Sequence, residues 1–257
     1  MVLPALYHYF RTPLPYAQTL ALQERIHQLQ LLQRKTSSHK DILLLLQHRP
    51  VYTSGRRQTE ASVQDERTRL MNIGADFVST ARGGELTFHG PGQIVGYPLI
   101  DLSRASPPMG IRDYICRMQK AIQLHLLEAH AIKNVPSEHT GVFLDANTKI
   151  ASIGVQVRHR LTTHGFAVNL TREPIAWLDE VVACGLADVK AGSVETAQDK
   201  AVNIDEEIPG LVSRLGRTLD RDLLPMNLAD EGEVGEYIAA AEAEALQAGD
   251  WEKAPRL

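Results

Sequence analysis

The sequence has few cysteines, no excess of positive charge and no long apolar run, and each of these absences argues against a class of protein. Two cysteines among 257 residues are too few for a disulfide scaffold or a four-cysteine zinc site, and they favour a reducing compartment. No apolar run approaches the roughly 20 residues that span a bilayer, which argues against a membrane protein. The net charge of −4 at pH 7 argues against a dedicated nucleic-acid binder.

Metal-ligand and nucleotide-binding patterns are also missing. The ten histidines form no H-E-x-x-H motif and no cluster with the cysteines, so the sequence predicts no metal site. The glycine-rich run at residues 82–92 has the spacing of neither a Walker loop nor a dinucleotide fingerprint. No cofactor is therefore expected.

Charge is unevenly distributed along the chain. Residues 226–257 hold eight acids and two bases, so they carry −6, and residues 1–225 carry +2 by difference from −4. We expect residues 1–225 to form one mildly basic domain that suits acidic partners. Residues 226–257 are expected to form an acidic C-terminal tail. Its Ala/Glu-rich part, residues 236–247, has little apolar face, so the tail is expected to be helical but weakly packed, or mobile.

Apolar periodicity predicts both helices and strands, in irregular order. Helical spacing predicts helices at 16–33, 65–74, 110–130 and 205–219, with Asp205 as the cap of the last. Short apolar runs predict strands at 42–47, 94–100, 142–144, 150–157, 164–170 and 181–186. Because strands and helices do not alternate regularly, the pattern favours an α+β fold, a mixed sheet flanked by helices, over a doubly wound fold.

The two cysteines have different sequence neighbourhoods. Cys116 lies within the predicted helix 110–130 and is expected to be a small, buried and inert side chain. Cys184 follows the apolar residues 181–183 and precedes Gly185, a setting that can hold a thiolate at the edge of a core. From this segment alone, Cys184 is either a nucleophile or a core cysteine at a strand end.

A nucleophilic cysteine needs a nearby base or cation that removes its proton or lowers its pKa. The candidate partners are Lys149, His164, His89 and Lys190. Lys149 lies at the mouth of the strand predicted at 150–157, where it is either a partly desolvated base or cation, or a solvated turn lysine. His164 is either an acid–base group or a hydrogen-bonded core histidine.

The densest glycine segment is RGGELTFHGPG, at residues 82–92. Gly83 and Gly84 allow backbone N–H groups to approach a ligand closely, and Arg82 is able to hold a phosphate or a carbonyl oxygen. The alternative is a glycine-rich turn without a ligand.

Six segments together resemble one known family. They are PVYTSGRR (50–57), RGGELTFHGPGQIVGYPLIDL (82–102), TGVF (140–143), KIASIGVQV (149–157), HGFAVNL (164–170) and ACG (183–185). Their order and spacing resemble those of the lipoyl(octanoyl) transferases, the octanoyl-[acyl carrier protein]:protein N-octanoyltransferases. The resemblance covers about residues 5 to 220, and the run RGG-x-x-T-[FY]-HGPGQ is highly specific.

The resemblance implies a fold like the catalytic domain of biotin and lipoate protein ligases, here residues 1–225. It also implies a cysteine–lysine dyad that needs neither ATP nor a metal. The family's nucleophile falls on Cys184 and its lysine on Lys149. The implied acyl-substrate pocket consists of Arg82, Gly83, Gly84, Glu85, Leu86, Thr87, Phe88, His89, Ser152, Ile153, Gly154, His164, Gly165, Phe166 and Ala167.

The implied reaction moves an octanoyl or lipoyl group from acyl carrier protein to Cys184 as a thioester, and then to a lysine of a lipoyl domain. This is the first step of endogenous protein lipoylation. The implied acceptors are the lipoyl domains of 2-oxoacid dehydrogenase E2 subunits and the glycine cleavage H protein. Neither nucleic acid nor membrane is implied as a partner.

Two alternatives stay open. An ATP-dependent lipoate or biotin-type protein ligase on the same fold would need a phosphate-binding loop and no reactive cysteine. A non-catalytic module that docks acyl carrier protein would need neither Cys184 nor Lys149.

The sequence departs from the family pattern in three places. Ala183 stands where proline is usual, Phe88 stands where tyrosine is common, and the segment after Cys184 is longer than usual.

The family is cytoplasmic in bacteria and mitochondrial in eukaryotes. The stretched segment and the GRR form of residues 55–57 favour a eukaryotic source, and hence a mitochondrial location.

Overall fold

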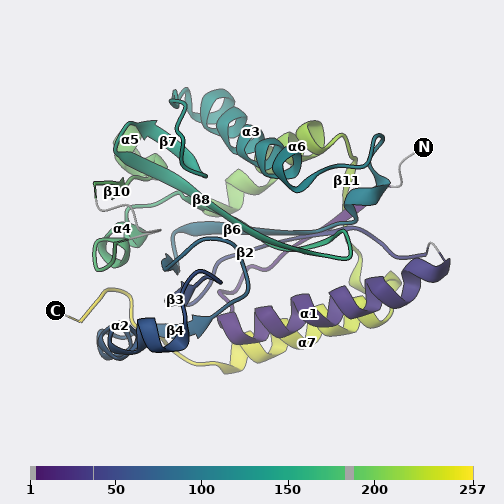
Figure 1. The fold of residues 1–257 in the computed structure, drawn as a ribbon, viewed down its shortest axis with the longest axis horizontal. Helices are drawn as coiled ribbons and strands as arrows, with labels where there is room; N and C mark the ends of the chain where they lie inside the picture. Colours follow the sequence, from purple (N-terminus) through teal and green to yellow (C-terminus); the bar gives the residue numbers. More distant parts are fainter. Residues whose placement is uncertain (1–3, 37, 183–187, 257) are drawn as a thin grey trace.

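The computed structural model describes residues 4–36, 38–182 and 188–256. A large mixed sheet lies between two helical layers (Figure 1). Helices α3 (Ile111–His130) and α6 (Ile204–Leu219) cover one face, and α1 (Tyr16–Gln33) and α7 (Glu233–Gln247) cover the other. Within the described ranges, no helix is both long and apolar enough to cross a membrane.

The main sheet confirms the expected mixed architecture. Its strand order is β10-β8-β9-β6-β2-β1-β11, and β7 pairs with β8. The bounds are β1 (Ala5–Tyr9), β2 (Ile42–Leu46), β6 (Gln93–Leu99), β7 (Val142–Asp145), β8 (Thr148–Arg158), β9 (Leu161–Asn169), β10 (Lys190–Ala191) and β11 (Leu223–Pro225). Strand β1 runs parallel to β2 and β11, whereas β2, β6, β9 and β8 pair antiparallel. Every residue of β2 is buried, because helices cover both faces of the sheet.

A second, three-stranded sheet stands beside the main one. It consists of β4 (Asp76–Ser79), β3 (Val51–Ser54) and β5 (Thr87–His89). Around it lie the helices α2 (Glu60–Asn72) and α4 (Glu173–Leu178), and α5 (Val194–Gln198) follows β10. Helix α2 begins before the predicted residue 65, because Thr59 and Ser62 form a capping box at its start.

Helix α3 corrects the expectation that Cys116 is buried. The helix buries a stripe that includes Tyr114, Met118 and Ile122, and this stripe packs in the core shared with α6. Cys116 lies between these positions in sequence and therefore on another side of the helix, where it is exposed.

Helix α6 has a different cap from the one predicted. Asn203, not Asp205, accepts a hydrogen bond at the helix start, from the backbone N–H of Asp205. The carboxylate of Asp205 instead accepts hydrogen bonds from the Tyr9 hydroxyl at 2.7 Å and from Arg11 at 2.6 Å. A contact distant in sequence thus takes the side chain that local reasoning assigned to the cap.

The strand predicted at 181–186 does not form in its described part. Val181 and Val182 follow helix α4 in an irregular conformation, and the Val181 N–H bonds to the Leu178 carbonyl at 3.3 Å. The apolar run predicted a strand here because two apolar residues that line a cavity have the same composition as part of a short buried strand.

The acidic C-terminal segment is helical and packed, not weakly attached. Helix α7 lies alongside α1 (Figure 1), and its residues Ile238, Ala241 and Ala245 are buried in the core on that face of the sheet. Small residues let the helix approach closely, so a narrow apolar face is enough. The division of the chain at residue 225 stays a prediction.

We expect Ile238→Ala in α7 to lower the free energy of unfolding by about 2–5 kcal/mol, because it leaves a cavity in the core. Ile238 is 0% exposed, whereas Leu246 in the same helix is 73% exposed. The matched control Leu246→Ala should stay within about 0.5 kcal/mol of the parent. Urea unfolding measures both, and equal small losses would show that α7 is not part of the folded core.

Candidate active site

Two adjoining cavities lie over strands β5, β8 and β9. The outer cavity has a volume of about 690 Å³ and the inner one about 40 Å³. Thr87, Ser152 and Ala167 line both cavities, so the inner one continues the outer one toward the core. Together they form a wide cavity that continues into a narrow one, a shape that suits a ligand with a long thin tail.

Lys149 lies in the wall of the outer cavity, at the start of β8. Its residue is only 8% exposed, so the alternative of a solvated turn lysine is wrong. The Nζ atom lies 5.7 Å from the centroid of the Phe143 ring on β7, a cation–π distance. The strand begins earlier than predicted and includes Lys149, whose carbonyl accepts a hydrogen bond from the Gly192 N–H at 2.9 Å.

Gly141 provides the space that the Lys149 side chain occupies. Its φ is +137°, and a Cβ there would lie 2.6 Å from the Lys149 Cε and 2.5 Å from the Ala151 carbonyl oxygen. Real Cβ atoms do not approach other atoms so closely, so only glycine fits. The segment TGVF thus has a steric role beside the lysine.

Cys184 lies outside the described residues. Residues on both sides of it are described, and they line the outer cavity together with Lys149: Val181 and Val182 before it, and Asp188 and Val189 after it.

The glycine-rich loop is held in place by its own arginine. Arg82 is 6% exposed, and its guanidinium donates to the Thr53 carbonyl at 2.6 Å, the Thr53 hydroxyl at 2.8 Å and the Glu85 carbonyl at 2.8 Å. The Gly83 N–H bonds to the Val155 carbonyl of β8 at 3.0 Å. Arg82 therefore fixes the loop as a wall of the inner cavity.

A chain of side-chain amides connects the HGPGQ segment to the strand beside Lys149. The Gln93 amide nitrogen donates to the Asn169 amide oxygen at 2.9 Å, and the Asn169 nitrogen donates to the Gly192 carbonyl at 2.9 Å. The Gln93 oxygen then faces Nδ1 of His89 at 3.3 Å, so His89 carries its proton on Nδ1. This chain fixes the floor shared by β6 and β9.

Buried tyrosines and histidines form part of the inner cavity's wall: Tyr16, His89, Tyr97 and His164 line it, and His48 packs beside His89 without lining it. His48 bonds through Nδ1 to the Leu14 carbonyl at 3.1 Å, and its Nε2 faces the Tyr97 hydroxyl at 2.7 Å. Tyr16 stacks on His89 with ring centroids 6.1 Å apart, and its hydroxyl lies 3.5 Å from Nδ1 of His164.

Burial keeps these histidines neutral. Desolvation lowers the pKa of His48 to about 4 and that of His164 to about 3, and it lowers the pKa of His89 well below its usual range. His164 also has a φ of +58°, and its N–H bonds to the Gln23 side chain at 2.8 Å. Of the alternatives for His164, the structure favours the hydrogen-bonded core histidine.

The model of the lipoyl protein ligase A/B catalytic domain family matches residues 15–215. The chain belongs to this family.

Two curated relatives are named octanoyltransferases. The mitochondrial octanoyl-[acyl-carrier-protein]:protein N-octanoyltransferase of Danio rerio is 37% identical over 177 residues, 69% of this chain and 76% of that protein. The octanoyltransferase of Koribacter versatilis is 33% identical over 189 residues, 71% of this chain and 73% of that protein. A crystal structure of lipoate-protein ligase A bound with ATP aligns with a TM-score of 0.68 at 19% identity, over 96% of this chain and 95% of that one. This last likeness confirms the expected ligase-like fold.

Most of the expected acyl-pocket residues of this lipoyl protein ligase A/B domain line the cavities. The inner cavity takes in Arg82, Gly83, Gly84, Thr87, His89, Ser152, Ile153, Gly154, His164, Gly165, Phe166 and Ala167. Phe88 lines the outer cavity and stacks on Trp177 with centroids 5.3 Å apart. Glu85 and Leu86 line neither; Leu86 packs in the core around Trp177. Lys190, another candidate base or cation for Cys184, is exposed and lines the outer cavity.

Several cavity-lining residues are absent from the predicted site, among them Tyr16, Gln93, Tyr97 and Asn169. Gln93 and Asn169 could have been found, because they end the HGPGQ and HGFAVN segments. Tyr16 and Tyr97 come from α1 and β6, and no local pattern marks them as neighbours of His89 and His164.

The buried histidines make the stability of the protein depend on pH. His48 has its ordinary pKa of 6.5 when unfolded and about 4 when folded, so the unfolded state binds the proton more tightly. Its contribution is complete above pH 6.5 and is lost as the pH falls toward 4. Between pH 7 and pH 5 we expect a loss of about 2 kcal/mol from His48.

Urea unfolding of the parent and of His48→Gln at pH 7 and pH 5 measures this loss. The variant should lose about 2 kcal/mol less than the parent between the two pH values. Equal losses would show that His48 takes up its proton equally in both states.

Proposed function

We propose that this chain is an octanoyltransferase that takes the octanoyl group of acyl carrier protein onto Cys184 as a thioester and passes it to a lysine of a lipoyl domain. Relatives named octanoyltransferases, aligned over 69% and 71% of the chain, support the class of reaction. The observation that supports the catalytic pair is the outer cavity. Its wall contains buried Lys149 and residues on both sides of Cys184.

The first half-reaction forms the acyl-enzyme. Lys149 takes the proton of the Cys184 thiol, and the resulting ammonium stabilises the thiolate. The thiolate attacks the carbonyl carbon of the donor thioester. The carbon–sulfur bond to the carrier then breaks, and the carrier's sulfur leaves as a thiol after it takes the proton back from Lys149.

The second half-reaction forms the amide. The acceptor lysine arrives as an ammonium and loses one proton to solvent. The neutral amine then attacks the carbonyl carbon of the thioester on Cys184. Lys149 takes a proton from the attacking nitrogen and returns it to the departing Cys184 sulfur. Since a thioester is replaced by a more stable amide, the transfer needs no ATP.

The acyl tail occupies the passage from the outer to the inner cavity. Gly154 and Gly165 lie opposite each other on β8 and β9 in the wall of the inner cavity. Neighbouring backbone packs against both, because a Cβ would lie 2.9 Å from the Gly83 carbonyl oxygen at Gly154 and 2.1 Å from the Gly96 carbonyl oxygen at Gly165. Each CH₂ that leaves water contributes about 0.8 kcal/mol. The buried side chains of Tyr97 and His164, which line the inner cavity, limit the length of chain that fits.

The acids around the outer cavity suit the acceptor. Glu66, Asp179, Glu180 and Asp188 line it, and they attract the ammonium form of an incoming lysine. We propose acyl carrier protein as the donor partner. The lipoyl domains of 2-oxoacid dehydrogenase E2 subunits and the glycine cleavage H protein are the proposed acceptors.

We also propose a mitochondrial location. A relative 37% identical to this chain is named mitochondrial, and the GRR form and the stretched segment after Cys184 agree with a eukaryotic source. A bacterial source would place the same enzyme in the cytoplasm.

An acyl-transfer assay tests the catalytic pair. The full chain is incubated with octanoyl-acyl carrier protein without ATP, and its intact mass is measured before and after addition of a lipoyl domain. We expect an octanoyl adduct that moves to the lipoyl domain. Cys184→Ser should form no thioester, and Lys149→Ala should slow adduct formation about 100- to 10,000-fold.

Matched controls use the same residue types elsewhere. Cys116→Ser and Lys120→Ala change an exposed cysteine and an exposed lysine of α3, and both should react like the parent. An adduct that survives in Cys184→Ser would contradict the proposed nucleophile. Transfer that needs ATP and free octanoate would instead identify the ligase alternative, and carrier binding without any adduct would identify the docking module.

Ala167 offers a test of the acyl passage, because it lines both cavities. Ala167→Leu should narrow the passage and reduce the ratio of octanoyl to butanoyl transfer by about tenfold or more. The two transfer rates are measured with donors of each chain length. The control Ala61→Leu, on the exposed side of α2, should leave the ratio unchanged. An unchanged ratio in Ala167→Leu would place the tail elsewhere.

A further inference from the structure

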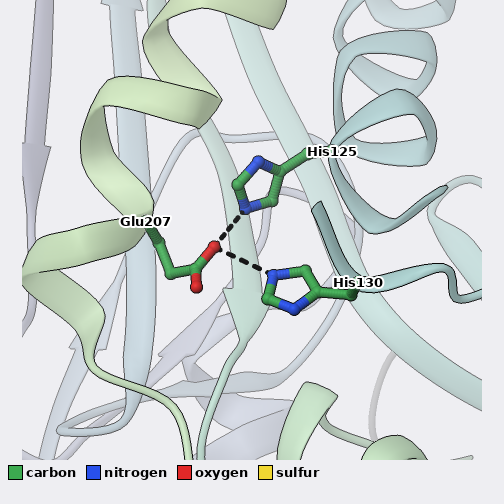
Figure 2. Close-up of side chains that lie close together, drawn as sticks. All are labelled: His125, His130 and Glu207. Carbon is green, nitrogen blue, oxygen red and sulfur yellow. Dashed lines mark hydrogen bonds and ion pairs between the residues drawn. The ribbon is translucent and has the colours of Figure 1, made fainter. Parts of the chain in front are cut away.

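A second group of chemistry-bearing side chains lies between α3 and α6, in the layer on the opposite side of β8 from α1. His125 and His130 come from α3, and Glu207 comes from the first turns of α6 (Figure 2). None of the three lines either cavity of the candidate active site. They are therefore not used by the proposed acyl transfer.

Both imidazoles direct Nε2 to one carboxylate oxygen. Nε2 of His125 lies 2.8 Å and Nε2 of His130 lies 2.9 Å from the same Oε2 of Glu207 (Figure 2). One nitrogen of each histidine and one oxygen of Glu207 lie within 4.8 Å of one another. The group is mostly buried, with His125 1% and the Glu207 side chain 13% exposed.

Gln198 determines which nitrogen of His130 carries the proton. Its amide nitrogen donates to the His130 carbonyl at 2.5 Å, so its oxygen is the atom that faces Nδ1 of His130 at 3.3 Å. Nδ1 therefore donates, and a neutral His130 has a lone pair on Nε2. That lone pair faces a carboxylate oxygen, which is also an acceptor, so a cation is required between them: a second proton or a metal ion.

His125 has ring nitrogens that the protein leaves poorly satisfied. Both of its ring nitrogens are buried and have no aligned hydrogen bond among the described residues, although Nε2 lies close to Glu207. A buried polar nitrogen without an aligned hydrogen bond is costly, and coordination of Nε2 to a metal would satisfy it. Nε2 faces the Glu207 carboxylate between the two helices (Figure 2).

The spacing also fits one shared ion. Two imidazoles bound through nitrogen to a tetrahedral zinc ion have ring centroids about 5 Å apart, given Zn–N bonds of about 2.0–2.1 Å. The centroids of His125 and His130 are 5.4 Å apart, with the rings inclined at 74°. The carboxylate would need to retreat by about half an ångström to make room for Zn–O and Zn–N bonds.

We propose that His125, His130 and Glu207 form a binding site for one divalent transition-metal ion that joins α3 to α6. Two imidazoles and one carboxylate are a donor set that suits zinc, with water as the fourth ligand. The Gln198 contact to Nδ1 of His130 orients that ring for the ion. The ion stabilises the helical layer and takes no part in the acyl transfer.

Zinc titration of the full chain tests the site. The protein is treated with EDTA, dialysed, and titrated with zinc chloride in competition with a chromophoric chelator. We expect one ion per chain and a higher melting temperature with zinc, because the unfolded chain lacks the assembled site. His125→Gln, His130→Gln and Glu207→Gln should each weaken binding at least about 100-fold, and Gln198→Ala about 10- to 100-fold.

The control His139→Gln removes an exposed histidine and should bind zinc like the parent. X-ray absorption of the zinc-loaded parent gives a readout that needs no variant to fold: two imidazoles, oxygen and no sulfur in the ligand shell. Absence of stoichiometric binding would leave a protonated histidine pair on Glu207 and overturn the proposal. Sulfur ligands, or binding unaffected by the ligand variants, would also overturn it.

Discussion

Strands β8 and β9 pair over eight residues on each strand, with Ser152 opposite Ala167 and Gly154 opposite Gly165. The walls of both cavities depend on this register, because a shift by one residue would turn every side chain of a strand to the other face. The register also holds Lys149 at the entrance, three residues before Ser152 on the same strand. Core packing on both faces of the sheet fixes it: Ile150 and Val168 pack beneath α3, whereas Ala167 belongs to the core on the side of α1.

Burial gives the site its chemical character. The wide outer cavity carries lysines and acids, whereas the narrow inner end consists of glycines, aromatic rings and neutral histidines. Desolvation removes the charge of His89 and His164 in the inner wall and of His48 behind it. Arg82 also lines the inner cavity and keeps its charge, and its guanidinium donates hydrogen bonds to the carbonyls of Thr53 and Glu85. The inner end thus combines neutral histidines with one arginine whose charge is bonded to the protein backbone.

The two helical layers contribute in different ways. Helix α1 provides Tyr16 to the inner cavity and Gln23 as the acceptor of the His164 N–H, and α7 packs against α1. Helices α3 and α6 contribute no residue to either cavity of the candidate active site; they pack on the opposite face and bring His125, His130 and Glu207 together. The proposed metal site and the acyl site therefore belong to opposite sides of one sheet, which allows the layer of α3 and α6 to be stabilised without a change in the catalytic wall.

The sequence by itself determined the positions of most central helices and strands and identified many residues of the candidate site. Helices α1 and α3 and strands β2, β6, β8 and β9 lie within a few residues of their predicted positions, because local apolar spacing encodes them. The motifs also identified Lys149 and most residues of the inner cavity before any contact was known. Only the tertiary structure decided that Cys116 is exposed, that Asn203 caps α6, that α7 is packed and that Glu207 meets two histidines about 80 residues away in sequence. These outcomes depend on which faces of distant elements meet, and a local pattern carries no information about the partner that covers it.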